Sequence, residues 1–261
     1  MKEFSYLDNK PLSANKKETL KCVAKEMVIS FKNILQKPKF RERLEKGQYK
    51  MLIGDDISGR LPTMFLRRII KDIYNRQGYQ DPVTHFIAGS GGLIMPDGLG
   101  ITNIKKQRRG EIKKIEIEDF LRQKKDDYVL GDDGRVLIIT DTIATGSSLL
   151  PLTQALQSLG ISFDIVAVSL ITSSDDKLLE NVFGGNIFYG LGGDPDIYNS
   201  RIRKVLGLEK KPQDLFSHKN LIDVSVQTEV RSFLNQASDD VLSWYNENFV
   251  KNVGEEKRDQ F

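Results

Sequence analysis

The segment from Val136 to Ser148 constrains the fold of this chain more than any other part of the sequence. It begins with four apolar residues, VLII, which have the composition of a strand buried on both faces. One carboxylate, Asp141, follows, and then small and hydroxyl-bearing residues up to Ser148. Leucines at helical spacing come next and stop before Gly160, which marks a helix end. The segment therefore predicts a strand, a turn and a helix in direct succession.

The same alternation extends over the middle of the chain. Short apolar runs predict strands, and apolar residues three or four positions apart predict helices. The stretch between Ala88 and Val136 is expected to be mostly irregular. The expected strands are 49–53, 83–88, the one that begins at Val136, 165–171 and 186–189. The expected helices are 16–36, a short charged helix ending near Gly47, 61–74, 149–159, 177–182 and one within 222–250.

Strands that alternate with helices predict βαβ units, right-handed crossovers and a mainly parallel sheet. We therefore expect an α/β core over residues 49–192. A helical N-terminal extension is expected at 1–48 and a helical C-terminal extension or hood at 193–261. Ligands of open parallel sheets bind beyond the carboxyl ends of the strands, so the loops after the strands are the places to look for function.

The turn after the Val136 strand is a candidate anion site. Backbone N–H groups and the positive end of the helix dipole converge at such a turn, and Thr145, Ser147 and Ser148 add hydroxyl donors. We expect Gly146 to lie where the backbone and the anion nearly touch. An ordinary turn capped by Ser147 or Thr145 is the alternative, because both residue types are common at helix N-caps.

This segment resembles the binding signature for phosphoribosyl pyrophosphate (PRPP) of the type I phosphoribosyltransferases. That signature has four apolar residues, two acidic residues and a loop containing Thr-Gly, and here Thr140 stands in place of the first acidic residue. The resemblance implies a type I phosphoribosyltransferase-like parallel sheet. It also implies that Asp141 contacts the ribose hydroxyls as a catalytic residue. The implied ligands of the 5′-phosphate are Thr142, Ala144, Thr145, Gly146, Ser147 and Ser148.

The loop after the first strand is a second candidate site. Ser58, Gly59 and Arg60 precede a helix that has proline in its first turn, and an arginine there can bind phosphate in bidentate fashion. The resemblance implies that these three residues contact pyrophosphate, with Arg60 catalytic. A helix start with a solvated arginine is the alternative.

Carboxylates near these loops suggest a magnesium site. Asp141 and Asp56 are the candidate Mg²⁺ ligands, and Asp55 or Asp56 could supply the carboxylate that Thr140 lacks. Aspartates at strand ends also serve as caps or turn formers, which is the alternative reading.

A glycine-rich stretch, 89–100, leads to four cations inside the long connection before Val136. The resemblance implies a flexible hood loop whose cations close over pyrophosphate and exclude water. A solvated charged face is the alternative. The four cations are Lys105, Lys106, Arg108 and Arg109.

Other residues favour no competing chemistry. The residues after the 165–171 strand are of types common in many loops and indicate no particular ligand. The two histidines, His85 and His218, form neither a triad nor a metal-ligand spacing. A histidine on a strand, such as His85, is more often a core residue. One cysteine, Cys22, provides no disulfide framework.

Composition narrows the class of protein. The net charge of +3 is nearly balanced, so we do not expect a nucleic-acid partner. No apolar run approaches the ~18 residues of a membrane span, and the first residues lack a signal-peptide core. We expect a cytoplasmic protein without a membrane partner, and a homodimer is possible.

The function implied by these features is transfer of phosphoribose from PRPP to an unidentified acceptor, with Mg²⁺ and release of pyrophosphate. This would make the protein a glycosyltransferase of nucleotide metabolism. Two alternatives stay open, because a fold does not fix a function. One is a PRPP-sensing regulator or accessory binding protein with little or no turnover, and the other is a nucleotide or ribosyl-phosphate hydrolase.

Overall fold

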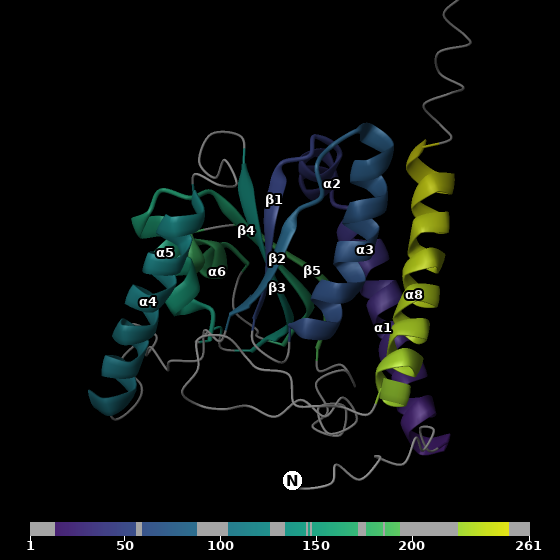
Figure 1. Cartoon of the computed structure of the whole chain (residues 1–261), viewed down its shortest axis with the longest axis horizontal. Coiled ribbons are helices and arrows are strands. Elements are labelled where there is room, and N and C mark those ends of the chain that lie inside the picture. Colours follow the sequence, from purple (N-terminus) through teal and green to yellow (C-terminus); the bar gives the residue numbers. More distant parts are fainter. Residues whose placement is uncertain are drawn as a thin grey trace, which may run out of the picture.

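The computed structural model describes residues 14–55, 59–87, 104–125, 134–171 except 145 and 147, 176–193 except 185, and 224–250. Within this part of the chain, five parallel strands form one sheet in the order β2-β1-β3-β4-β5 (Figure 1). The strands are β1 (Tyr49–Asp55), β2 (Val83–Ile87), β3 (Arg135–Ile143), β4 (Phe163–Leu170) and β5 (Asn186–Gly192).

The strand order reverses between β1 and β3. The chain leaves β1 toward one edge of the sheet to form β2, and then returns to place β3 on the other side of β1. Such a reversal leaves a crevice beyond the carboxyl ends of the two strands, which is the usual ligand site of open α/β sheets. The expected α/β class with a parallel sheet is therefore confirmed.

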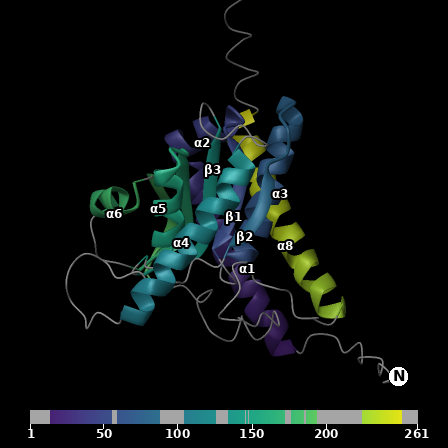
Figure 2. The same cartoon turned by 60° about the vertical axis from the view of Figure 1, so that its left-hand side comes forward.

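Helices cover both faces of the sheet. Alternate strand residues face opposite ways, so that Leu52 and Leu137 pack in one core while Ile53 and Ile138 pack in the other. Of the two helical layers, the first contains α1 (Ala14–Leu35), α2 (Pro38–Glu45), α3 (Arg60–Gln77) and α8 (Val224–Tyr245), and the second contains α4 (Ile104–Lys125), α5 (Leu150–Ser158) and α6 (Asp176–Phe183). Figures 1 and 2 show α4 and α5 on one side of the sheet and α3 and α8 on the other.

The two outlying helices, α1 and α8, pack on the core rather than standing apart from it. Ser30 on α1 donates a hydrogen bond of 2.9 Å to the backbone oxygen of Val168 on β4. A Cβ at Gly190 on β5 would lie 2.2 Å from the backbone oxygen of Ser30, so this glycine lets α1 approach the sheet closely. A π-helical turn (Asn246–Val250) follows α8. The helices expected at 16–36 and within 222–250 are thus confirmed over their described parts.

Helix α8 also contacts α3 through charged groups. Arg68 on α3 and Asp239 on α8 form an ion pair of 2.7 Å between exposed side chains.

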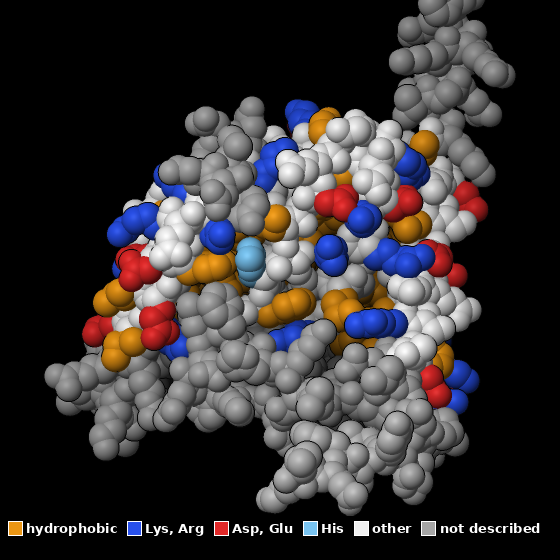
Figure 3. Space-filling view, in the orientation of Figure 1, with side chains coloured by type: hydrophobic (Ala, Val, Ile, Leu, Met, Phe, Trp, Pro, Cys, Tyr) orange, Lys and Arg blue, Asp and Glu red, His pale blue; other side chains and the backbone are white. Residues whose placement is uncertain are grey.

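Acidic and basic side chains are interspersed on the face seen in Figure 3. No helix in the described part of the chain is both long enough and apolar enough to cross a bilayer.

The expectation of an irregular stretch between Ala88 and Val136 is wrong over 104–125, where the chain forms α4. Among its described side chains, only two apolar ones, Ile117 and Leu121, are fully buried, while Ile112 and Ile115 are more than half exposed. So narrow an apolar stripe in a highly charged segment does not give a clear helical period. The four cations predicted to close a hood loop lie in the first two turns of this helix, and their side chains are outside the described part.

A buried aspartate connects four elements at the amino-terminal edge of the sheet. Asp164 on β4 is 0% exposed and pairs with two arginines, Arg43 on α2 at 2.5 Å and Arg135 on β3 at 3.1 Å. It also accepts hydrogen bonds of 2.9 Å from Tyr49 on β1 and from Asn186 on β5. Burial, followed by the charge of Asp164, raises the pKa of Tyr49, so the phenol stays protonated as a donor. This network fixes α2 and three further strands around β4.

Replacing this aspartate should destabilise the fold strongly. In Asp164→Ala, two largely buried guanidinium groups lose their counter-charge, which typically costs about 3–5 kcal/mol of unfolding free energy. Urea unfolding followed by circular dichroism measures the loss. Asp239→Ala, which removes the exposed partner of Arg68, should cost less than about 1 kcal/mol. A similar small loss for both variants would contradict a structural role for the Asp164 network.

The histidine on β2, expected to be a core residue, is only half-buried and packs against α4. The His85 ring lies edge-on to Phe120 of α4, with 5.0 Å between ring centroids. Its buried Nε2 atom has no hydrogen-bond partner within the described part of the chain. Burial, followed by the nearby charge of Lys124, lowers the pKa of His85 below its ordinary value.

This lowered pKa predicts a pH-dependent stability. As pH falls from above the unfolded value of about 6.5, the unfolded chain binds a proton that the folded His85 rejects, so the folded state loses stability. The loss continues until the pH reaches the lowered folded pKa. Urea unfolding at pH 7.5 and pH 5.5, values on the order of one unit either side of the unfolded pKa, should show a smaller difference for His85→Phe than for the wild type. His218→Gln separates the contribution of the second histidine. An unchanged difference in His85→Phe would contradict the assignment.

Candidate functional site

Two buried aspartates lie at the carboxyl ends of the strands where the sheet order reverses. Asp55 ends β1 and is 4% exposed, and Asp141 lies near the end of β3 and is 6% exposed. The two strands are hydrogen-bonded neighbours in a register that pairs Gly54 with Ile139. These aspartates lie where ligands of open α/β sheets bind, so this edge of the sheet is the candidate site.

The backbone of β3 orients the carboxylate of Asp141. The N–H of Thr142 donates a hydrogen bond of 2.6 Å to Asp141 Oδ1, and the Thr140 hydroxyl lies 3.5 Å from the same oxygen. Thr140 itself is 1% exposed. The position where the resemblance implies a first acidic residue therefore holds a buried hydroxyl that contacts the second.

The turn between β3 and α5 brings small groups to the same place. Gly146 is buried and has φ +68°, and its carbonyl accepts a hydrogen bond of 2.9 Å from the N–H of Leu149 just before α5. The Thr142 hydroxyl oxygen is buried and lacks a hydrogen-bond partner among the residues that the structure describes. Ala144 is exposed beside it. An unsatisfied buried hydroxyl near the end of a strand is the kind of group that a bound anion would satisfy.

A hydrogen bond joins this turn to the neighbouring strand. Ser148 Oγ lies 3.0 Å from Asp55 Oδ2. The contact brings one predicted phosphate ligand together with the end of β1. Two other predicted ligands of the turn, Thr145 and Ser147, are outside the described residues.

Gly146 has a structural reason to be glycine that the sequence did not reveal. A Cβ at this position would lie 2.1 Å from Cζ of Phe183, a fully buried residue of α6. The side of Gly146 that we expected to face a ligand is thus occupied by an aromatic ring. The positive φ adds a second requirement for glycine. Contact between its backbone and a ligand stays a prediction.

Gly59 lies against both strands of the site. Its N–H donates a hydrogen bond of 2.8 Å to the carbonyl of Asp55. A Cβ there would lie 2.4 Å from the backbone nitrogen of Asp55 and equally close to the backbone oxygen of Ile139. Only glycine fits so close an approach, and α3 therefore begins directly at the point where the strand order reverses.

Arg60, the first residue of α3, is not the solvated arginine of the alternative interpretation. It is 8% exposed, and its guanidinium carbon lies 4.8 Å from the ring centroid of Phe86 on β2. This stacking holds a positive charge near the carboxyl edge of the sheet. Ser58 and Asp56, which precede it, are outside the described residues.

The donor set of the site fits Mg²⁺ but not an all-protein metal cage. Mg²⁺ is usually held by one or two carboxylates together with substrate phosphates and water, and Asp55 and Asp141 can supply the carboxylates. The described residues contain no group of three His, Cys, Asp or Glu side chains placed to hold a metal ion. Binding of Mg²⁺ stays a prediction.

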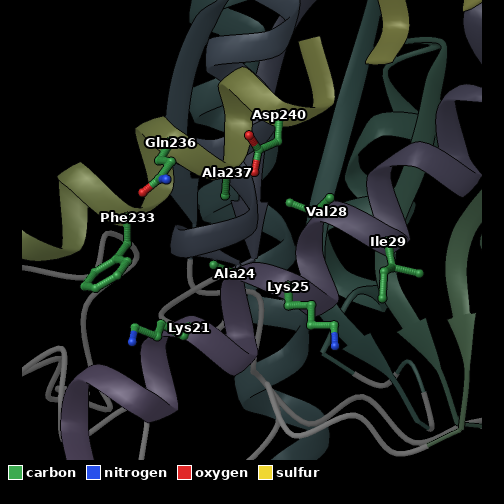
Figure 4. A pocket seen from close by; sticks show the side chains of 9 residues that line it. All are labelled: Lys21, Ala24, Lys25, Val28, Ile29, Phe233, Gln236, Ala237 and Asp240. Atoms are coloured by element: carbon green, nitrogen blue, oxygen red, sulfur yellow. The ribbon is translucent and has the colours of Figure 1, made fainter. Parts of the chain in front are cut away.

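A groove of about 520 Å³ lies elsewhere, between α1 and α8 (Figure 4). Ala24, Val28 and Ala237 line it with apolar groups, and Lys21 and Asp240 carry charges on opposite helices. No residue that the sequence marked as a candidate ligand contributes to it. The groove is therefore separate from the reversal of the strand order.

Comparison with protein-family models finds no match to this chain, and comparison with curated proteins finds none either.

The glycine of the turn provides a test with a matched control. Gly146 and Gly160 both have positive φ, but a Cβ at Gly160 meets no atom within 4 Å in the described structure. Gly160→Ala should cost only the backbone strain, about 1–2 kcal/mol of unfolding free energy. Gly146→Ala should lose a further ~1–3 kcal/mol because its methyl group would overpack Phe183.

Urea unfolding of the two variants measures this difference. Phe183→Leu introduced into Gly146→Ala should recover part of the lost stability, because it removes the ring atom in the way. Equal losses for the two alanine variants would show that Phe183 does not constrain the turn.

Proposed function

We propose that this protein binds PRPP at the carboxyl ends of β1 and β3 and transfers its phosphoribosyl group to a nucleophilic acceptor. The observation that carries the proposal is a coincidence of two independent features. The segment that resembles a PRPP-binding signature, 136–148, lies at the one point of the described sheet where the strand order reverses. Ligands of open α/β sheets bind at such a point for reasons of topology alone.

The turn between β3 and α5 would hold the 5′-phosphate. The Ser148 hydroxyl is a donor just before the N-terminus of α5, whose dipole favours an anion. The buried Thr142 hydroxyl, near the end of β3, would be a second donor. Thr145 and Ser147 belong to the same proposed set. The backbone of Gly146 gives the turn its shape.

Asp141 would orient the ribose. Its carboxylate is held by the Thr142 N–H and can accept hydrogen bonds from sugar hydroxyls. In the reaction, the bond between the anomeric carbon and the pyrophosphate oxygen breaks, and the acceptor forms a new bond to that carbon and loses its proton. Mg²⁺, bound through carboxylates and pyrophosphate oxygens, would supply positive charge to the leaving group.

Arg60 would stabilise the departing pyrophosphate. Its guanidinium is already positioned by the Phe86 ring, so little reorganisation is needed when negative charge develops. The cations at 105–109 are proposed to add to this charge. Catalysis of this kind depends on positioning and electrostatics rather than on a covalent intermediate.

A second candidate function is a PRPP-responsive binding protein without turnover. The observation that favours it is Thr140, a buried hydroxyl in the place where the resemblance implies an acidic residue. Both candidates use the same binding site. They differ in whether pyrophosphate is released.

The site assignment can be tested through Asp141. Asp141→Asn keeps the shape of the side chain but removes a charge-assisted hydrogen bond worth about 1.5–3 kcal/mol. PRPP affinity measured by calorimetry should therefore fall by roughly 10- to 150-fold. Asp239→Asn on α8 is a matched control with the same change of charge, and its PRPP affinity should equal that of the wild type. Unchanged affinity in Asp141→Asn would remove Asp141 from the site.

Pyrophosphate release then distinguishes an enzyme from a regulator. The wild-type protein is incubated with PRPP and Mg²⁺ against a panel of nucleobases, and pyrophosphate is measured. Release with one acceptor, lost in Asp141→Asn, supports the transferase. PRPP binding without release for any acceptor supports the binding protein.

A further inference from the structure

The two outer strands of the sheet, β5 and β2, are protected to different degrees. Asn33 of α1 donates a hydrogen bond of 2.9 Å to the carbonyl of Gly190 on β5. The Lys37 ammonium lies 4.8 Å from the ring centroid of Tyr189 on the same strand. Polar and charged side chains, lysines above all, keep a further strand from pairing with an outer strand. In the described part of the chain, β2 pairs with β1 and with no other strand.

The residues of β2 do not prevent a further strand from pairing. The strand, VTHFI, contains no Lys, Arg, Asp, Glu or Pro, and its register with β1 is continuous. Burial, followed by the charge of Lys124, lowers the pKa of His85, so the ring is neutral at pH 7. An uncharged, regular outer strand is the kind that pairs with another chain.

Apolar side chains flank β2 on both faces of the sheet. Val83 and Phe120 of α4 are half-buried on one face, and Phe86 is half-buried on the other. Figure 3 shows apolar side chains open to view between α4 and α3, which Figure 1 labels in the same orientation. A second chain that pairs with β2 would remove part of this apolar surface from water, which favours association.

The outer side of β2 is complementary in charge to a second copy of itself. A strand presents N–H groups with partial positive charge and carbonyl groups with partial negative charge, and an antiparallel copy places each group opposite its counterpart. Two identical antiparallel strands are related by a two-fold axis, which closes the assembly at two copies. All five residues of β2 take part only when His85 lies opposite the same residue of the second copy.

We propose that two copies of this protein pair through β2 in antiparallel orientation and join their five-stranded sheets into one continuous sheet. The two-fold axis passes beside His85. Antiparallel pairing turns the carboxyl ends of the two sheets in opposite directions, so each candidate phosphate site stays within one copy. The inference is therefore independent of the proposed function.

Sedimentation analysis of the full-length protein measures the association. The wild type should sediment as a dimer at micromolar concentrations. His85→Lys places two ammonium groups opposite each other on the axis, so its dimer dissociation constant should rise at least about tenfold. Ile29→Lys adds the same group to an exposed position on α1 and should leave the dissociation constant unchanged.

Two results of this measurement would overturn the inference. One is a wild type that stays monomeric at these concentrations, which would leave β2 to a strand of some other protein or to none. The other is a dimer that is lost in Ile29→Lys but kept in His85→Lys. That result would place the second copy at the groove between α1 and α8, which Ile29 lines.

Disulfide cross-linking tests the register and does not depend on the folding of His85→Lys. The exposed native cysteine is first removed as Cys22→Ser. In this background, His85→Cys places two cysteines on the axis, with about 4.5–5.5 Å between their Cα atoms, which is within the range of a disulfide. Thr84→Cys is the matched control, because its two Cα atoms would be about 8 Å apart and too distant to be bridged.

Oxidation by copper–phenanthroline should convert most of the His85→Cys protein, but little of the Thr84→Cys protein, into a covalent dimer on a non-reducing gel. Equal cross-linking of the two variants would overturn the proposed register. Absence of cross-linking in His85→Cys would overturn the pairing through β2.

Discussion

Two crossovers on the two sides of β1 organise the described structure. One crossover leads from β1 through α3 to β2, and the next leads through α4 to β3 on the opposite side. Crossovers between parallel strands are almost always right-handed, so two that move across the sheet in opposite directions place their helices on opposite faces. Residues of α3 and α4 indeed belong to different hydrophobic cores. The same geometry separates the loops beyond β1 and β3 and brings the ends of these two strands to the candidate site.

Buried carboxylates lie at both edges of the sheet. At the amino-terminal edge, Asp164 accepts hydrogen bonds from two guanidinium groups, a phenol and an amide, so its charge is balanced within the fold. At the carboxyl-terminal edge, Asp55 accepts a hydrogen bond from the Ser148 hydroxyl and Asp141 from the Thr142 N–H. The contacts of Asp164 give it a structural role, whereas Asp55 and Asp141 lie where ligands of open α/β sheets bind.

Long-range packing gives the turn at the site its shape. Phe183 of α6 occupies the space beside Gly146, and Ser148 reaches the end of β1. Gly59 brings the start of α3 against both central strands. The turn is therefore supported by elements before and after it in the chain. A site supported in this way holds its groups in position before a ligand arrives, which reduces the entropy lost on binding.

The sequence by itself determined the local elements and the motif of the β3–α5 turn, because buried strands and amphipathic helices have periods that can be read from neighbouring residues. It also placed Asp141 near the end of one strand, and Gly59 and Arg60 between another strand and the helix that follows it, where a parallel sheet exposes its loops. It did not reveal α4, whose fully buried apolar stripe contains, among the described side chains, only Ile117 and Leu121.

Only the tertiary structure decided which groups meet at the site. The contact of Ser148 with Asp55, the ring of Phe183 beside Gly146 and the stacking of Arg60 on Phe86 all join separate elements. Their formation depends on strand order and on the packing of helices across the sheet. Periodicity describes one element at a time and carries no information about strand order, which is the physical reason that these contacts could not be predicted from the sequence.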